Sequence, residues 1–294
     1  AGTGLGVVLP VMARMVRPER RAFALGLGTA AGSAGQFLLI PVAQSFLSVY
    51  GWQTALLIMA IGAFSMILFS APIAEENSAE SAQIESPDQT LKEALKEAFS
   101  HTHYWLLIAG FFVCGFQLAF ITVHMPSYLA DMGFDGSVAA ISLSLIGLFN
   151  IFGSLIAGQM SGIYSKKWLL GYIYLARAIA IVIFLVFPIS IFSIYCFSIV
   201  TGFLWLATVP PTSGLVAQMF GLKYMATLYG FVFLNHQIGS FFGVWLGGYY
   251  FDQTGSYNQI WWAAAIIATI TAIIHIFIDE RPIARIRQKK VAKA

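Results

Sequence analysis

Long apolar runs are the feature that most constrains this sequence. A membrane-spanning helix needs about 20 consecutive, mostly apolar residues, and such runs fill most of the chain between its polar breaks. They predict an incomplete span at 1–16 and full spans at 22–49, 52–72, 104–130, 136–162, 168–188, 189–217, 224–250 and 258–279. We therefore expect an all-α membrane protein.

The composition agrees with a bilayer as the solvent. Of the 294 residues, 59% are hydrophobic and only 10% are charged, whereas soluble chains carry about a quarter charged residues, which cover their surface. This deficit excludes a cytosolic enzyme, a nucleic-acid-binding protein and a disordered chain. The two cysteines, Cys114 and Cys196, lie in apolar stretches and indicate no disulfide framework.

The positions of the basic residues predict the orientation of the spans. Lys and Arg stay in short cytoplasmic loops, and all 16 of them except Arg177 fall in alternate loops if the first span ends in the cytoplasm. The opposite loops hold only Asp131, Asp135 and Asp252. We therefore expect a multi-pass protein of the plasma (inner) membrane with a cytoplasmic C-terminus.

A hydrophilic stretch at about 73–103 separates three spans from six. Within it, Thr90 and Glu93 fit a capping box, and Leu91, Leu95 and Phe99 recur at helical spacing. The pattern favours a short amphipathic helix on the inner membrane face. The alternative is a solvated linker with only nascent helix, because charged runs are often solvated.

Two stretches share a pattern of glycines four residues apart followed by a Gly and Trp turn. Such spacing lets helix backbones approach closely in a membrane, and its recurrence in the same order favours an internal repeat. A six-helix repeat would place three further spans upstream and give twelve spans in two halves. The residues are Gly28, Gly32, Gly51 and Trp52 in the first stretch, and Gly239, Gly243, Gly247, Gly255 and Trp261 in the second.

Several segments of the chain, quoted below, resemble the major facilitator superfamily. The opening GTGLGVVLPVMARMVRPERRAFALGLG is similar to the fourth and fifth helices of its bacterial monocarboxylate-porter and oxalate–formate-antiporter branches. HMPSYLADMG and AAISLSLIGLFNIFGSLIAG resemble the seventh and eighth helices, and HQIGSFFGVWLGGYYFDQTGSYNQIWW resembles the eleventh and twelfth. The resemblance implies the major facilitator fold with nine of twelve transmembrane helices present and the N-terminal three missing. It divides the chain into the end of the N-terminal half (1–72, helices 4–6), a cytoplasmic linker (73–103), a C-terminal six-helix half (104–280, helices 7–12) and a basic cytoplasmic tail (281–294).

Two departures from the family pattern bear on the substrate. The second copy of the signature loop begins at Gly158 and lacks its Asp and first Arg. The monocarboxylate porters also place an Asp and an Arg on the eighth helix, where this chain has Asn150 and Ser154. The residue that would pair with a substrate carboxylate is therefore absent from that position.

Transport sites in this architecture lie near the bilayer midplane, so polar residues near span centres are candidates. Gln117 and His124 share a face of the 104–130 span, and Trp205 and Thr208 share a face of the 189–217 span with Thr201 and Thr212. The alternative for each is ordinary packing between helices. The candidate substrate-binding residues are Gln36, Gln117, His124, Asn150, Trp205, Thr208, His236 and Gln237.

The ionisable residues inside the spans include His124, Arg177 and His236, of which Arg177 and His236 lie near span centres. Because no Asp or Glu lies mid-span in the visible spans, a proton-coupling carboxylate would have to come from the missing helices, or His236 or His124 carries the proton. The alternative for His236 is a neutral His bonded to a neighbouring helix. Arg177 costs about 2.5 kcal/mol or more at a span centre unless it is paired. It falls on what resembles the peripheral ninth helix, so a structural role, bonding to carbonyls or hydroxyls, is favoured over a contact with a substrate anion.

No sequence motif of an enzyme, a P-loop or a metal site is present. We therefore expect no enzymatic activity and no cofactor. The sequence predicts a secondary active transporter of a small organic solute, with an organic anion as one candidate, that works by alternating access. Its expected partners are the lipid bilayer, the solute and protons as the candidate coupling ion, and it is expected to be monomeric. The alternatives are an efflux pump for amphipathic compounds and, less favoured, a non-transporting membrane sensor.

Overall fold

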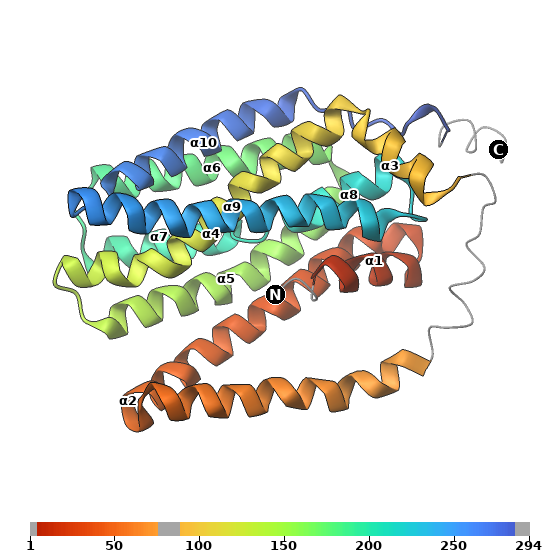
Figure 1. The fold of residues 1–294 in the computed structure, drawn as a ribbon. Helices are drawn as coiled ribbons and strands as arrows, with labels where there is room; N and C mark the ends of the chain where they lie inside the picture. The colour runs from red at the N-terminus through yellow and green to blue at the C-terminus, as the bar shows by residue number, and fades with distance from the viewer. Residues whose placement is uncertain (1–4, 76–88, 286–294) are drawn as a thin grey trace.

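The computed structural model describes residues 5–75 and 89–285, which form helices joined by short turns and contain no strand (Figure 1). Residues 76–88 of the expected linker and 286–294 of the expected tail lie outside the described residues. The helices are α1 (Leu5–Met15), α2 (Arg21–Glu75), α3 (Leu91–Phe99), α4 (Thr102–Asp131), α5 (Gly136–Ile163), α6 (Lys166–Val186), α7 (Ile191–Leu204), α8 (Val209–Phe220), α9 (Met225–Thr254) and α10 (Asn258–Ile276).

Six helical stretches of the described residues are long and apolar enough to cross a membrane. Helix α9, which covers the span expected at 224–250, has 30 residues but carries Asn235, His236 and Gln237 near its centre. The predicted all-α membrane fold is confirmed. The six stretches are Pro18–Phe64, Thr102–Asp131, Gly136–Ile163, Lys166–Val186, Ile191–Phe220 and Asn258–Ile276.

Helix α2 contains both spans expected at 22–49 and 52–72. Gly51 interrupts it with φ 74° and ψ 171°, a left-handed φ that glycine adopts without a steric penalty. The two arms fold back at this point and lie at the edge of the molecule (Figure 1). The turn therefore falls at the expected Gly51–Trp52 position.

The span expected at 189–217 is not one continuous helix. Helix α7 ends at Leu204, and α8 begins at Val209 with Pro210 and Pro211 in its first turn. Proline lacks a backbone N–H and clashes with the preceding turn, so it is tolerated at a helix start and not in its interior. Residues 205–208 consequently form a break inside this span, and the single polar face expected along it does not run unbroken.

The short amphipathic helix expected before the fourth span is confirmed as α3. The Thr90 hydroxyl accepts a hydrogen bond from the Glu93 N–H, and the Glu93 carboxylate accepts one from the Thr90 N–H, which together form the expected capping box. Ala94 and Ala98 are buried. Arg285 forms an ion pair with Glu97 at 3.3 Å, so α3 is fixed against the segment that follows α10.

The glycines of α9 allow that helix to pack directly on α4. A Cβ atom at Gly239 or Gly243 would collide with the carbonyl oxygens of Phe112 and Phe116. This is the close approach expected from glycines spaced four residues apart. Helix α2 packs in the same close manner on α5 through Gly26 and Gly158.

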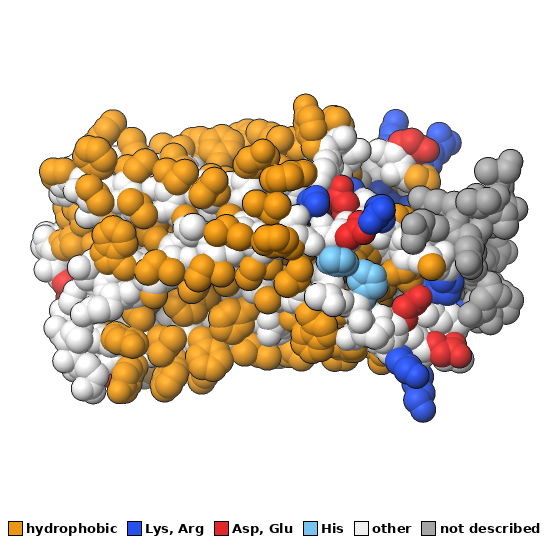
Figure 2. Space-filling view, turned by 90° about the horizontal axis from the view of Figure 1, so that it is seen from above, with side chains coloured by type: hydrophobic (Ala, Val, Ile, Leu, Met, Phe, Trp, Pro, Cys, Tyr) orange, Lys and Arg blue, Asp and Glu red, His pale blue; other side chains and the backbone are white. Residues whose placement is uncertain are grey.

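Charged and apolar side chains separate along the length of the bundle. Figure 2 shows hydrophobic side chains over the middle of one face, with Lys, Arg, Asp, Glu and His side chains gathered toward one end. Among the described residues of the spans, Arg177 is a basic residue that is buried well inside a helix, with 4% of its surface exposed. The apolar middle of the surface is therefore suited to the hydrocarbon core of a membrane, and the charged end to its aqueous side.

Candidate functional site

The break between α7 and α8 leaves backbone groups without helical partners at membrane depth. In a continuous helix, the carbonyls of Leu204 and Trp205 would accept from the N–H groups of Thr208 and Val209. Val209 instead donates to Leu206, at 2.9 Å. Non-helical backbone is tolerated at this depth only where protein or a cavity satisfies it, so the partners of these groups define the site.

Arg177 of α6 supplies the donors for both carbonyls. Its Nε and Nη2 atoms donate to the Leu204 carbonyl at 3.1 and 2.6 Å, and Nη2 also donates to the Trp205 carbonyl. The third nitrogen, Nη1, faces the Gln117 amide oxygen at 3.4 Å and the Cys114 sulfur at 3.5 Å. If Arg177 has a structural role, backbone carbonyls are the partners that the sequence leads us to expect. No carboxylate among the described residues bonds to Arg177.

Asn150 of α5 satisfies the opposite side of the break. Its Oδ1 accepts from the Leu206 N–H at 2.9 Å and from the Ser154 hydroxyl at 3.1 Å. Its Nδ2 donates to the Ser33 hydroxyl of α2 at 2.6 Å. Asn150 is fully buried, so its amide is occupied by protein partners in this conformation.

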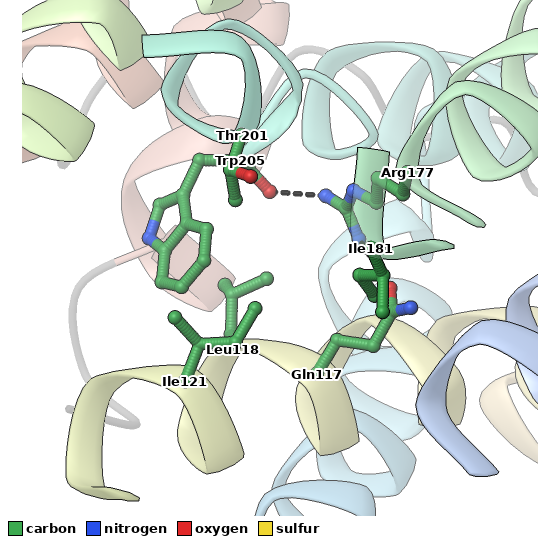
Figure 3. Close-up of a pocket in the computed structure, with 7 residues that line it drawn as sticks. All are labelled: Gln117, Leu118, Ile121, Arg177, Ile181, Thr201 and Trp205. Carbon is green, nitrogen blue, oxygen red and sulfur yellow. Dashed lines mark hydrogen bonds between the residues drawn. The ribbon is translucent and has the colours of Figure 1, made fainter. Parts of the chain in front are cut away.

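A small, partly open cavity of about 10 Å³ adjoins the break (Figure 3). Its volume matches about one water molecule, so it does not hold an organic solute in this conformation. Figure 3 shows the guanidinium of Arg177 bonded to Trp205, with the Gln117 side chain directed toward Arg177. The lining residues are Gln117, Leu118, Ile121, Arg177, Ile181, Thr201 and Trp205.

Cys114 joins this cluster although sequence reasoning placed it in an ordinary apolar stretch. Its sulfur lies 3.2 Å from the Thr208 hydroxyl and is fully buried. Gln117, three residues further along α4, donates to the Ala264 carbonyl at 3.0 Å. The i, i+3 spacing of Cys114 and Gln117 is the only sequence signal that could have linked them.

The histidines of the spans occupy different environments. His124 Nε2 lies 2.9 Å from the Val244 carbonyl, and His275 Nδ1 lies 2.8 Å from the Thr271 carbonyl. His236 Nδ1 contacts the Gln237 side-chain oxygen at 3.1 Å, but its buried Nε2 has no hydrogen-bond partner. The His236 ring stacks on Phe233.

Gln36 lies in α2 and contacts α5, away from the break. Its Nε2 donates to the Leu143 carbonyl of α5 at 3.4 Å. The structure thus gathers five of the named residues around the break and leaves Gln36, His124 and Gln237 in separate contacts, whereas His236 adjoins the cluster through Cys114. The five are Gln117, Asn150, Arg177, Trp205 and Thr208.

The chemistry of this arrangement is hydrogen bonding and apolar contact. Hydroxyl, amide and indole groups meet beside a helix break, and no group of three or more metal-ligating side chains occurs in the described part of the chain. Sites of this kind, built from discontinuous spanning helices, bind solutes in secondary transporters.

The comparisons with known proteins agree with this architecture. The model of the Major Facilitator Superfamily matches residues 1–244. The uncharacterized MFS-type transporter YcxA of Bacillus subtilis is 24% identical over 281 residues, which cover 89% of this chain and 65% of that protein. Monocarboxylate transporter 12 of Rattus norvegicus is 23% identical over 295 residues, which cover 87% of this chain and 60% of that protein. The chain therefore spans less than two thirds of the length of these relatives.

Solved structures share the fold at low sequence identity. The fucose:proton symporter of E. coli matches with a TM-score of 0.70 and 17% identity, covering 93% of this chain and 73% of that structure. The proton:xylose symporter XylE matches with a TM-score of 0.66 and 12% identity, covering 97% of this chain and 70% of that structure.

Proposed function

Because the chain belongs to the major facilitator superfamily, a family of transporters, we propose that the protein containing it is a secondary active transporter. It moves a small organic solute by alternating access of a site between its two halves. The observation that carries this proposal is the break between α7 and α8, where Trp205 and Thr208 lie beside satisfied backbone groups. The break places buried, hydrogen-bonded polar groups inside an apolar bundle.

The substrate is a small solute recognised mainly by hydrogen bonds. Arg177 is engaged by two backbone carbonyls, and Asn150 and Ser154 stand at the positions that resemble the eighth-helix charges of monocarboxylate porters. The described residues thus offer no free mid-span cation to a carboxylate. An organic anion is also proposed as a substrate, because the chain is similar to a protein named as a monocarboxylate transporter. Residues outside this cluster would then bind the negative charge of the anion.

Protons are the proposed coupling ion, carried by His236. One ring nitrogen of His236 contacts the Gln237 side chain and the other, the buried Nε2, has no hydrogen-bond partner, whereas the bonded ring nitrogens of His124 and His275 face backbone carbonyls. Imidazole changes charge near neutral pH, so the unpartnered nitrogen can take up a proton when solute and water reach it.

Efflux of amphipathic compounds is the second candidate. An apolar groove of about 470 Å³ lies between α6 and α7, lined by side chains that include Phe184, Phe187 and Phe192. A groove of this kind on the apolar surface suits a compound that arrives from the membrane.

The charged end of the bundle is the proposed cytoplasmic side. It holds α3 and the segment after α10 (Figure 1), so the C-terminus is cytoplasmic in a plasma (inner) membrane if basic residues face inward. Residues 1–72 and 104–280 are then parts of two halves, joined by the 73–103 linker, and the transporter acts as a monomer.

Transport by the full-length protein in proteoliposomes tests the proposal. Radiolabelled monocarboxylates, hexoses and a lipophilic cation are supplied separately, with and without an imposed pH gradient. We expect saturable flux of one solute class that Trp205→Ala reduces at least about tenfold, as for a lost binding contact, with Trp262→Ala as the control because Trp262 is 39% exposed. Flux of the lipophilic cation alone would support efflux, and no flux of any of the three classes would contradict transport.

A further inference from the structure

Asn150 connects two parts of the fold that are far apart in the sequence. Its Nδ2 donates to Ser33 in α2, 117 residues away, and its Oδ1 accepts from the Leu206 N–H in the break, 56 residues away. Asn150 and Ser33 are no more than 1% exposed. One side chain therefore joins the surface between α2 and α5 to the unwound part of the α7–α8 span.

Close backbone contacts flank this connection on both sides. A Cβ atom at Gly158 would lie 2.8 Å from the Gly26 Cα, and one at Gly147 would lie 2.9 Å from the Phe37 nitrogen. Ser33 lies between Gly26 and Phe37 along α2, as Asn150 lies between Gly147 and Gly158 along α5. Separation of α2 from α5 must therefore break the bond between Ser33 and Asn150.

The carboxamide of Asn150 is a rigid planar group, so its two ends cannot move independently. If Nδ2 loses Ser33, a rotation that gives it a new acceptor also moves Oδ1 away from the Leu206 N–H. That N–H would then be buried without a partner, which is unfavourable in an apolar environment. The backbone of the break must rearrange or admit water in response.

We propose that Asn150 is a positioning residue that couples the separation of α2 from α5 to the backbone conformation of the break carrying Trp205 and Thr208. This role rests on the proposed alternating access of the two halves. Closed halves hold the break in the conformation described above, and open halves release it. Asn150 thus acts on the solute site through the break, without contacting the solute.

A disulfide that locks the two helices together tests this coupling without any solute. A Cβ atom at Gly162 would lie 3.1 Å from the Ala22 Cβ. This is closer than the roughly 3.5–4.5 Å between the Cβ atoms of a disulfide, so the two helices need to move apart by a few tenths of an ångström to accept the crosslink. We would introduce Ala22→Cys and Gly162→Cys together with Cys196→Ser into the full-length protein in nanodiscs. Amide hydrogen exchange of the 204–209 segment would then be compared between the oxidised and reduced forms.

Oxidation should slow exchange in this segment roughly fivefold, the scale of one hydrogen bond. Ser33→Ala removes the bond between the helices, together with the bond from the Ser33 hydroxyl to the Thr29 carbonyl within α2, and should abolish the difference. Ser45→Ala should preserve it, because Ser45 is exposed on the same helix and its hydroxyl donates to the Pro41 carbonyl within that helix. Asn150→Ala should give fast exchange in both redox forms.

An oxidation-dependent difference that survives Ser33→Ala unchanged would overturn the proposal, as would equal exchange in the oxidised and reduced parent. Ser33→Ala is a small change, so the test stands even if Asn150→Ala fails to fold. Because exchange is measured without solute, failure of the proposed transport activity would leave this result intact.

Discussion

Gly26 of α2 and Gly158 of α5 cross with their backbones in direct contact. A Cβ atom at Gly26 would lie 2.7 Å from the Ser154 carbonyl oxygen and 3.0 Å from the Gly158 Cα. Separations under 3.0 Å from backbone atoms cannot be relieved by turning a side chain. Both positions therefore require glycine if α2 and α5 are to pack as closely as they do.

Gly158→Ala should weaken the packing of α2 on α5. The added methyl group meets backbone, and overpacking of this kind costs about 1–3 kcal/mol. The yield of the Ala22–Gly162 cysteine crosslink measures the closed population and should fall severalfold. Gly32→Ala is the matched control, because a Cβ at Gly32 meets nothing within 4 Å; an equal loss of crosslinking in both variants would contradict the expectation.

Arg177→Lys should destabilise the fold although it keeps the charge. A single ammonium cannot reproduce the set of bonds from Nε and Nη2 to the Leu204 and Trp205 carbonyls. A buried carbonyl left unpaired costs about 1–3 kcal/mol. Thermal unfolding in detergent should occur at a lower temperature than for the parent and for Lys167→Arg, which changes a residue at the start of the same helix. Unchanged unfolding would show that the carbonyls find other partners.

Substitution of His236 and of His124 should have different consequences. His236→Gln removes the unpartnered ring nitrogen and should abolish proton movement during solute flux while leaving solute exchange across the membrane. His124→Gln disturbs the contact with Val244 and should lower thermal stability with coupling retained. A pH-sensitive dye inside proteoliposomes measures proton movement during solute flux. Proton movement that is lost with His124→Gln but kept with His236→Gln would show that His124, and not His236, carries the proton.

The attachment of α3 should weaken as the pH falls. Burial, and next the neighbouring His103, lower the pKa of His101 from its ordinary value of 6.5, against smaller opposing effects of Asp279 and Glu97. The folded state therefore favours neutral His101. The resulting stability is fully present above pH 6.5 and is lost as the pH falls below 6.5 toward the lowered pKa, because the unfolded state binds the proton first.

Hydrogen exchange of α3, corrected for the intrinsic pH dependence, measures this effect. Exchange should be faster at about pH 5.5 than at about pH 7.5. His101→Gln should remove most of the difference, and Lys92→Gln, which changes an exposed residue of the same helix, should leave it. A difference that is the same in all three proteins would exclude His101 as the titrating group.

The features that sequence predicted well depend on near neighbours in the chain. The capping box of Thr90 and Glu93 spans three residues, and the turn at Gly51 depends on the conformational freedom of one residue. The glycines of α9 predicted close packing but not its partner, α4. The adjacent Pro210 and Pro211 are also local, and they could have predicted the break that the expected continuous span did not include.

The contacts of the candidate site were beyond sequence reasoning because periodicity carries no information about distant partners. Arg177 could be expected to bond to carbonyls, since an unpaired charge in a membrane is costly. Which carbonyls it reaches, 27 and 28 residues away, depends on how α6 packs beside the break. Likewise, His124 and His236 are equivalent in sequence, and only their surroundings distinguish them.

The sequence by itself determined that this chain lies in a membrane as a set of helices, because about 20 apolar residues are enough to specify a span whatever its neighbours are. The tertiary structure decided what the polar residues inside those spans do. Asn150 joins Ser33 to Leu206, and Arg177 bonds to the carbonyls at the end of α7, because each buried polar group must find a partner among the helices packed around it.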